Sequence, residues 1–200
     1  MTSKPIILAS TSTIRAQLLH NAGLDFTVLA ADIVEDDVKK IVQAETSEAD
    51  KLSQRLAAEK ALSISRKVTG RLVVGCDQVL ECDGRVFNKP IDVNDARNTL
   101  MALRGKEHCL HTAIAVALDG RIIWQHLETP RLQMRDFSGE FLADYLNRSG
   151  EAVVQSAGGY QLENLGIQLF SSFKGDYFAI LGLPLLPLLD FLRLHVILKN

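Results

Sequence analysis

The sequence predicts an α/β fold built on a mixed β-sheet. Strand-like and helix-like segments alternate over the first half of the chain, a pattern typical of strands joined by helical connections. Two Asp-Gly pairs, at residues 83–84 and 119–120, each separate two strand-like runs and predict antiparallel hairpins. A sheet with both kinds of connection contains parallel and antiparallel strands. The 200 residues suffice for one large domain or for two small lobes that share a core.

The expected strands are short apolar runs bounded by small or turn-forming residues. The first, residues 5–10, ends in hydroxyl residues and is expected to be buried. A long antiparallel pair is expected over residues 108–137. The remaining strands are expected at residues 25–30, 71–76, 78–82 and 85–87, and within residues 167–180.

The expected helices are marked by apolar spacing and by capping residues. Ser47 opens a capping-box-like run before the strongest helical pattern in the chain, residues 49–67. The acidic run at residues 31–37 is expected to be a loop. The other helices are expected at residues 12–23 with Gly23 as the cap, at 92–105 with Asp92 as the cap, at 138–150, and from about Pro184 onward.

The charge balance excludes several classes of partner. The formal net charge is −2 and the pI is about 6.2, so no strong global field attracts nucleic acid polymers or anionic membranes. An anionic ligand must therefore be held by a local cluster of cations. The apolar run from Tyr177 to Leu189 contains two prolines and is soon followed by charged residues, so a buried core helix is expected rather than a membrane span.

The cysteines indicate a reducing environment. Cys76, Cys82 and Cys109 form no CxxC pair, so neither a disulfide framework nor a zinc site is indicated. Small core residues are the better interpretation of Cys76 and Cys82. No signal-peptide pattern precedes the first strand. We therefore expect a cytoplasmic protein.

The run "LASTSTIR", residues 8–15, joins a predicted strand to a predicted helix. Backbone N–H groups and the helix dipole favour an anion at such a junction. Ser10, Thr11 and Ser12 add hydroxyl donors, and Arg15 adds a forked cation suited to phosphate. An ordinary helix cap with a surface arginine explains the pattern equally well. The familiar phosphate fingerprints, GxxxxGK[ST] and GxGxxG, are absent from the sequence.

Two further residues have chemistry that suits a nucleotide site. Asp77 ends an apolar strand, where a carboxylate is well placed to hold Mg²⁺ or to orient a water molecule. Lys89 precedes Pro90, which restricts its backbone to extended conformations and fixes a cation. A strand-end cap and an ordinary loop lysine are the alternatives. His108 and His111 are expected on opposite faces of a strand, so they cannot share a metal ion.

Seven motifs follow one another over about residues 6–192: "LASTSTIRAQLL", "RLAAEKA", "GCDQV", "NKP", "GKEH", "SAGGYQLENLG" and "GDYFAILGLPLLPLL". In order and spacing they resemble the motifs of the Maf-like nucleoside triphosphate pyrophosphatases. The resemblance implies one domain over residues 1–200, with an elongated two-lobed fold, a mixed sheet and a cleft between the lobes, similar to the inosine-triphosphate pyrophosphatases. It also implies a homodimer that hydrolyses a nucleoside triphosphate to the monophosphate and pyrophosphate with Mg²⁺ or Mn²⁺.

The resemblance also assigns site residues. The family's proton-accepting aspartate is matched by Asp77, and its two lysines by Lys60 and Lys89. By its position in the long predicted helix alone, Lys60 is expected on a solvated face. Glu35 matches the family's acidic residue before the long helix, which would hold the metal ion together with Asp77. The phosphate-binding loop is matched by Ser10, Ser12 and Arg15.

The sequence departs from the family pattern at two places. The usual Ser-Pro-Arg-Arg is Ser-Thr-Ile-Arg at residues 12–15, which lacks one arginine, and an Asp-Lys pair is replaced by Gln155 and Ser156. These departures support an alternative function, a catalytically weakened nucleotide-binding regulator of cell division. A phosphatase or a nucleotidyltransferase with a similar metal site is a third interpretation.

Three positions bear on the base of the nucleotide. Gln78 after the catalytic aspartate, together with Glu163, resembles the 7-methyl-GTP-type subgroup rather than the dTTP/UTP-type. The position of Ile14 is usually a tryptophan in that subgroup, so a stacking platform for a methylated base is lost here. The Glu163 carboxylate can accept hydrogen bonds from the N1–H and N2–H₂ edge of guanine. We therefore expect a purine or modified-purine substrate.

Overall fold

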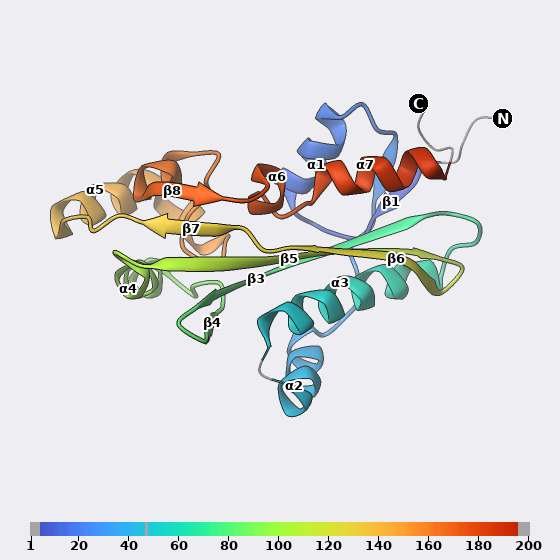
Figure 1. The fold of residues 1–200 in the computed structure, drawn as a ribbon, viewed down its shortest axis with the longest axis horizontal. Coiled ribbons are helices and arrows are strands. Elements are labelled where there is room, and N and C mark those ends of the chain that lie inside the picture. Colours follow the sequence, from blue (N-terminus) through green and yellow to red (C-terminus); the bar gives the residue numbers. More distant parts are fainter. Residues whose placement is uncertain (1–4, 47, 196–200) are drawn as a thin grey trace. The chain divides into compact units, whose positions relative to one another are not determined.

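The structure is a computed structural model that describes residues 5–46 and 48–195. Eight strands of this described part form a mixed sheet in the hydrogen-bonded order β2-β1-β3-β5-β7-β8, with β4 paired to β3 and β6 paired to β5 (Figure 1). Helices alternate with the strands along the chain. The predicted α/β fold with a mixed sheet is confirmed.

The described residues divide into two compact units. Unit 1 contains the described residues up to Gln78, Thr112–Glu128 and the described residues from Gly182 onward. Unit 2 contains Val79–His111 and Thr129–Leu181. Strands β3 (Val73–Cys82) and β5 (Glu107–Leu118) contribute residues to both units.

Unit 1 begins with a parallel strand pair joined by a helix. Strand β1 (Ile6–Leu8) pairs in parallel with β2 (Phe26–Val28) and with β3. Helix α1 (Thr13–Asn21) connects β1 to β2 and begins after Ser12, whose hydroxyl accepts a hydrogen bond from a backbone N–H of the first turn. Gly23 follows the helix with φ of 72°, a conformation that favours glycine. The predicted strands and the predicted helix are confirmed in this segment.

The prediction of an acidic loop over residues 31–37 is wrong from Glu35 onward. Helix α2 (Glu35–Glu45) begins there, and three consecutive acidic residues form its first turn. Carboxylates near a helix N-terminus are stabilised by the positive end of the helix dipole, so an acidic run can open a helix. The structure therefore places Glu35 at a helix start, where its position is better defined than in a loop.

The long predicted helix is confirmed as α3 (Ala49–Ser65). Its N-cap residue is Glu48, and the predicted cap Ser47 lies outside the described residues. Alanines 57 and 61 of α3 are fully buried against the strands of unit 1. These small side chains allow a close approach, and a Cβ atom at Gly75 of β3 would overlap the backbone carbonyl of Ala57. Helix α3 and strand β3 therefore meet almost backbone to backbone.

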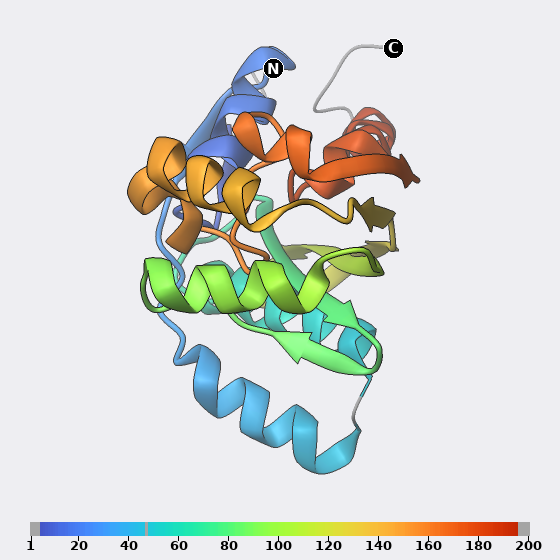
Figure 2. The ribbon, with the colours of Figure 1, turned by 90° about the vertical axis from the view of Figure 1, so that its left-hand side faces the viewer.

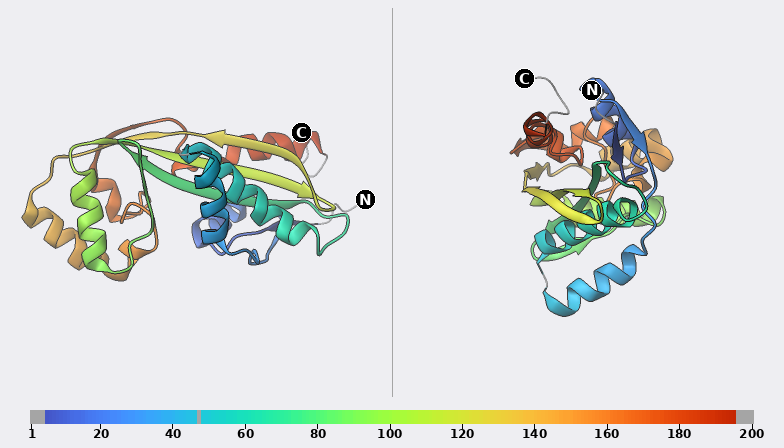
Figure 3. Two further views of the ribbon diagram at one scale, coloured as in Figure 1. Left: turned by 90° about the horizontal axis from the view of Figure 1, so that it is seen from below. Right: turned by 90° about the vertical axis from the view of Figure 1, so that its right-hand side faces the viewer.

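Two helices cover opposite faces of the unit 1 strands (Figure 1 and Figure 3). Strand β6 (Arg121–Glu128) forms a hairpin with β5, and the turn is the predicted Asp-Gly pair at residues 119–120 with positive φ at both residues. Helix α3 packs along β6 on one face. On the other face Trp124 stacks on Phe191 of α7 (Leu185–Leu194), with ring centroids 5.0 Å apart.

The apolar C-terminal run forms a core helix, as predicted. Leu185, Leu188, Phe191 and Leu192 of α7 are buried. Pro184 precedes the first residue of the helix, which agrees with the predicted start. Within the described part of the chain, no helix combines the length and the apolar character that a bilayer span requires.

Unit 2 contains the second predicted hairpin and the two remaining predicted helices. The β3–β4 turn has positive φ at Asp83 and Gly84, as type I′ hairpins require. Helices α4 (Val93–Leu103) and α5 (Gly139–Ser149) lie side by side (Figure 2). Helix α4 begins after its predicted cap Asp92, and α5 begins after Ser138, the first residue of the predicted range. The other elements of unit 2 are β4 (Arg85–Phe87), β7 (Arg131–Met134), η1 (Gly150–Val154), η2 (Leu165–Leu169), β8 (Phe170–Lys174) and α6 (Tyr177–Ile180).

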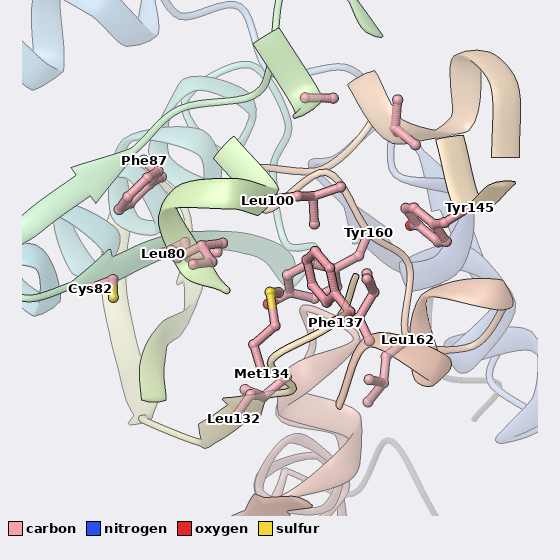
Figure 4. Close-up of a cluster of buried hydrophobic side chains, with 14 of the residues drawn as sticks. Leu80, Cys82, Phe87, Leu100, Leu132, Met134, Phe137, Tyr145, Tyr160 and Leu162 are labelled. Carbon is pink, nitrogen blue, oxygen red and sulfur yellow. The ribbon is translucent and has the colours of Figure 1, made fainter. Parts of the chain in front are cut away.

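The core of unit 2 gathers around Tyr160 (Figure 4), where Phe137, Met134 and Leu100 are also buried. His108 is buried in the same unit, and its Nε2 lies 2.8 Å from the Tyr160 hydroxyl. Its Nδ1 has no hydrogen-bond partner among the described residues. Burial lowers the pKa of His108 from 6.5 to about 4, so the imidazole is neutral in the folded protein at pH 7.

We expect the stability of the protein to fall between pH 6.5 and pH 4 because of His108. Over this range the unfolded chain binds a proton at His108 and the folded chain does not, so protonation favours unfolding as the pH falls. The two pKa values, 6.5 and about 4, correspond to about 3 kcal/mol. In denaturant unfolding, the unfolding free energy of His108→Gln should fall by about 3 kcal/mol less than that of the wild type between pH 6.5 and pH 4. The exposed His20→Gln is the control, and an unchanged pH dependence in His108→Gln would contradict the assignment.

Candidate active site

A lysine of unit 1 bridges two carboxylates. The Lys60 Nζ lies 2.6 Å from Asp77 Oδ1 and 2.7 Å from Glu35 Oε1. The side chains of Lys60 and Asp77 are 12% and 10% exposed, whereas Glu35 is 46% exposed. Because α3 and β3 approach closely at Gly75, Lys60 in the second half of α3 lies beside Asp77 of β3. The default expectation of a solvated Lys60 is wrong, and the ion pair is largely withdrawn from water.

Burial and charge have opposite effects on Asp77. Burial, the largest effect, raises the pKa of the Asp77 carboxyl above its ordinary value. The ion pair and hydrogen bond with Lys60 and the charge of Arg15 lower the pKa, while Glu35 raises it. The balance is a raised pKa. A carboxylate with a raised pKa is a better proton acceptor than an exposed one, which suits a general base.

Arg15 holds three segments of unit 1 together. Its Nε donates to the Gly182 carbonyl at 2.7 Å, and its Nη1 donates to the Cys76 carbonyl at 2.9 Å and to Ser10 Oγ at 3.2 Å. Ser10 Oγ also accepts a hydrogen bond from the backbone N–H of Ser12. The arginine therefore fixes the loop between β1 and α1 against the residue before Asp77, and it places a permanent positive charge near that carboxylate.

The structure brings together part of the predicted site. Asp77, Lys60 and Glu35 are in contact, and Ser10, Ser12 and Arg15 form one hydrogen-bonded loop beside them. Ile14 is half-buried in the first turn of α1. Gln78 donates a hydrogen bond to Thr112, and both residues belong to unit 1. Lys89 and Glu163 are exposed residues of unit 2, and their roles stay predictions.

Three contributors to this region were not predicted from the sequence. Two are the backbone carbonyls of Cys76 and Gly182, which accept the hydrogen bonds of Arg15. Every residue has a backbone carbonyl, so no sequence motif could identify these two acceptors. The third is Thr112, a buried hydroxyl next to an apolar run of β5. A hydroxyl residue at the start of such an apolar run is the signal that could have singled it out, because a buried polar group needs a partner.

Two cavities lie within unit 2. One, of about 240 Å³, is lined by Gln161 and Asn164, which flank Glu163 in the chain, and by residues of α5. The other, of about 530 Å³, is lined by Cys82, Cys109 and several charged side chains. The thiols of both cysteines have pKa values raised by burial, so these groups are poor nucleophiles at pH 7. The predicted cleft stays a prediction.

The two carboxylates at Lys60 fit a shared divalent cation. Asp77 and Glu35 already direct one oxygen each toward the same ammonium group, so their geometry permits a common positive partner. Mg²⁺ in nucleotide sites is usually bound by one or two carboxylates, with water and phosphate oxygens as its other ligands. Over residues 5–46 and 48–195, no group of three or more acidic, histidine or cysteine side chains forms a complete metal site. Enzymes that hydrolyse nucleoside triphosphates generally use such a cation.

An α/β fold with charged side chains at the carboxyl ends of parallel strands is typical of nucleotide-handling enzymes. Strands β1 and β3 pair in parallel at Val73 and Val74, and the loop with Ser10 and the carboxylate of Asp77 follow these paired segments. The prediction that Asp77 ends a strand is wrong, because β3 continues through it to Cys82. The Maf-like protein family matches residues 5–195, and the chain belongs to this family. The resemblance carried by the seven motifs is thereby confirmed.

Curated relatives are similar to this chain over nearly their whole length. A nucleoside triphosphate pyrophosphatase of Paramagnetospirillum magneticum is 50% identical over 187 residues, which cover 94% of this chain and 96% of the relative. A protein of the same name from Nitrobacter hamburgensis is 50% identical over 190 residues, with 95% and 93% covered. A 7-methyl-GTP pyrophosphatase of Brucella abortus is 42% identical over 188 residues, which are 94% of each chain.

Proposed function

We propose that the protein hydrolyses nucleoside triphosphates to the nucleoside monophosphate and pyrophosphate. The observation that carries the proposal is the buried pair of Asp77 and Lys60 in the middle of β3, in a chain of the Maf-like family. The names of the relatives support the same reaction. A raised pKa and an adjacent fixed cation are the properties that water activation next to a phosphate requires.

In the proposed reaction Asp77 orients a water molecule and accepts its proton. The water oxygen forms a bond to the α-phosphorus, and the bond from that phosphorus to the oxygen that bridges to the β-phosphorus breaks. Pyrophosphate leaves with the bonding electrons, and Lys60, Arg15 and Lys89 neutralise its growing charge. A divalent cation held by Asp77 and Glu35 would supply further stabilisation of that charge. Ser10 and Ser12 would fix the position of the phosphates.

We further propose Mg²⁺ or Mn²⁺ as the metal ion, a cytoplasmic location and a homodimer. The homodimer rests on the resemblance to the family. Light scattering coupled to gel filtration tests it, because a dimer has twice the chain mass of 22.1 kDa. A net charge of −2 supports the absence of a nucleic acid polymer as partner.

Replacement of Lys60 by methionine should increase the response of the protein to a divalent cation. The change removes the positive charge between Asp77 and Glu35 and leaves a buried carboxylate without its partner, which costs about 3 kcal/mol or more. A cation that binds both carboxylates would offset this loss. We therefore expect Mn²⁺ to raise the Tm of Lys60→Met by more than it raises the Tm of the wild type.

Thermal unfolding with and without Mn²⁺ and direct Mn²⁺ binding by electron paramagnetic resonance measure this effect. The control is Lys40→Met, since Lys40 pairs with Asp37 on the exposed face of α2. Equal Mn²⁺ responses of Lys60→Met and the wild type would mean that Asp77 and Glu35 do not hold the cation.

We propose a purine or modified-purine nucleotide as the substrate. Glu163 offers a carboxylate to the N1–H and N2–H₂ edge of guanine, and Gln78 offers an amide. The relative of Brucella abortus named 7-methyl-GTP pyrophosphatase supports this class. Ile14 takes the place of the tryptophan expected for a methylated base, so the rates of hydrolysis of GTP and 7-methyl-GTP should be compared.

Incubation with a panel of nucleoside triphosphates and Mg²⁺, followed by separation of the products, tests the proposed function. Monophosphate and pyrophosphate are the expected products, with purine nucleotides preferred. No turnover together with a nucleotide-dependent rise in Tm would favour the regulator of cell division, which the missing arginine at residues 12–15 supports. Diphosphate and phosphate would instead indicate a phosphatase.

A further inference from the structure

We propose that Thr112 is a positioning residue that holds the side chain of Gln78 and so sets the nucleotide preference of the enzyme. The proposal rests on the proposed function, in which Gln78 contacts the substrate. Gln78 Nε2 donates a hydrogen bond to Thr112 Oγ1 at 2.8 Å. The two residues are far apart in the sequence but belong to the same unit of the structure.

Thr112 is a buried polar residue at the start of an apolar stretch of β5. Thr112 is 0% exposed, and the five residues that follow it in β5 are alanine, isoleucine and valine, all buried. A buried hydroxyl without a hydrogen bond costs free energy, so an apolar residue would be the ordinary choice at this position. The hydrogen bond with Gln78 gives this buried hydroxyl a partner.

The threonine side chain is well suited to hold its partner. A β-branched residue in a strand has few accessible χ1 rotamers, so the hydroxyl of Thr112 has a defined position. Gln78 by itself has a long side chain with several freely rotating bonds, and fixing it in advance reduces the entropy lost when a ligand binds. Thr112 therefore prepares Gln78 for contact before the substrate arrives.

The position of Gln78 explains why this contact would affect selectivity more than chemistry. Successive side chains of a strand point to opposite faces, so Gln78 points away from the face on which Asp77 meets Lys60. A nucleotide that reaches both residues presents its phosphates to Asp77 and another part of the molecule to Gln78. The hydrogen bond to Thr112 thus acts on recognition of the base or sugar.

The Thr112→Val variant tests the proposal, because valine keeps the shape of threonine and lacks the hydroxyl. The selectivity is measured as kcat/KM for the preferred purine triphosphate divided by kcat/KM for UTP. We expect this ratio to fall by about fivefold in Thr112→Val, the effect of one lost hydrogen bond. Thr112→Ser keeps the hydroxyl and should restore most of the wild-type ratio. A ratio in Thr112→Val equal to that of the wild type would overturn the proposal.

A double-mutant cycle separates positioning from a general effect on packing. In a Gln78→Ala background the Thr112→Val change should leave the ratio unaltered, because the side chain that Thr112 holds is gone. An equal fall of the ratio in both backgrounds would show that Thr112 does not act through Gln78. Should the wild type hydrolyse no nucleotide, the proposed function would fail, but dissociation constants for α,β-methylene analogues of GTP and UTP would still supply the ratio.

Discussion

The Asp77→Asn variant is expected to lose about 1000-fold in kcat for pyrophosphate release while it still binds nucleotide. Asparagine has nearly the same shape as aspartate, so the packing around this position of β3 is preserved. It cannot accept a proton from water, and it has no charge to pair with Lys60 or a metal ion. The loss should appear in kcat rather than in KM, since the missing interaction acts mainly in the transition state.

The wild-type pH profile provides an independent check on Asp77. A general base works when deprotonated, and burial raises the pKa of Asp77, so activity should rise with pH through a range above that of an ordinary aspartate. Asp32→Asn is the matched control, because Asp32 forms an exposed ion pair with Lys67. Near-normal turnover by Asp77→Asn would exclude the proposed role.

The Gly75→Ala variant is expected to lose about 3 kcal/mol or more of unfolding free energy. A Cβ at this position would overlap the Ala57 carbonyl and lie 2.7 Å from the Ala61 backbone nitrogen. These are backbone atoms of α3, so the clash cannot be relieved by rotation of a side chain, and the helix must move from the strand. Because α3 carries Lys60 and Gly75 is two residues before Asp77, the same movement should separate the ion pair and lower kcat.

Chemical denaturation and steady-state kinetics measure both parts of this prediction. Gly139→Ala is the matched control, since a Cβ at the first residue of α5 meets no atom within 4 Å. That variant should be as stable as the wild type or slightly more so. If Gly75→Ala had the same denaturation midpoint as the wild type, α3 and β3 would be less closely packed than in the structure.

Most secondary structure could be predicted because its signals are local. The Asp-Gly turns at residues 83–84 and 119–120 and the caps at Ser12, Asp92 and Ser138 depend on a few neighbouring residues. Two predicted strand boundaries are wrong: β3 continues through Asp77, and the long pair predicted over residues 108–137 ends with β6 at Glu128 and is followed by the separate strand β7. A further exception is α2, in which the acidic residues from Glu35 form the first turn. An acidic run is compatible with both a solvated loop and a helix start, and local composition does not distinguish the two.

The candidate site was predicted only in part. Resemblance to the family selected Asp77, Lys60 and Glu35, and the structure adds that one ammonium group bridges both carboxylates. Its position in a helix alone predicted that Lys60 is solvated. That prediction failed because Lys60 is buried by the close approach of α3 to β3 at Gly75, which the local sequence does not reveal. The roles of Lys89 and Glu163 stay predictions, since both are exposed residues of unit 2.

The sequence by itself determined the fold class, most of the strands and helices, and the family. These depend on apolar spacing, on turn and cap chemistry within a few residues, and on the order of motifs along the chain. Only the tertiary structure decided that Lys60 is buried between two carboxylates, that Arg15 joins three segments, and that Thr112 holds Gln78. The physical reason is that the energy of a charge or a hydroxyl depends on the distant residues that displace its water, and local sequence does not specify them.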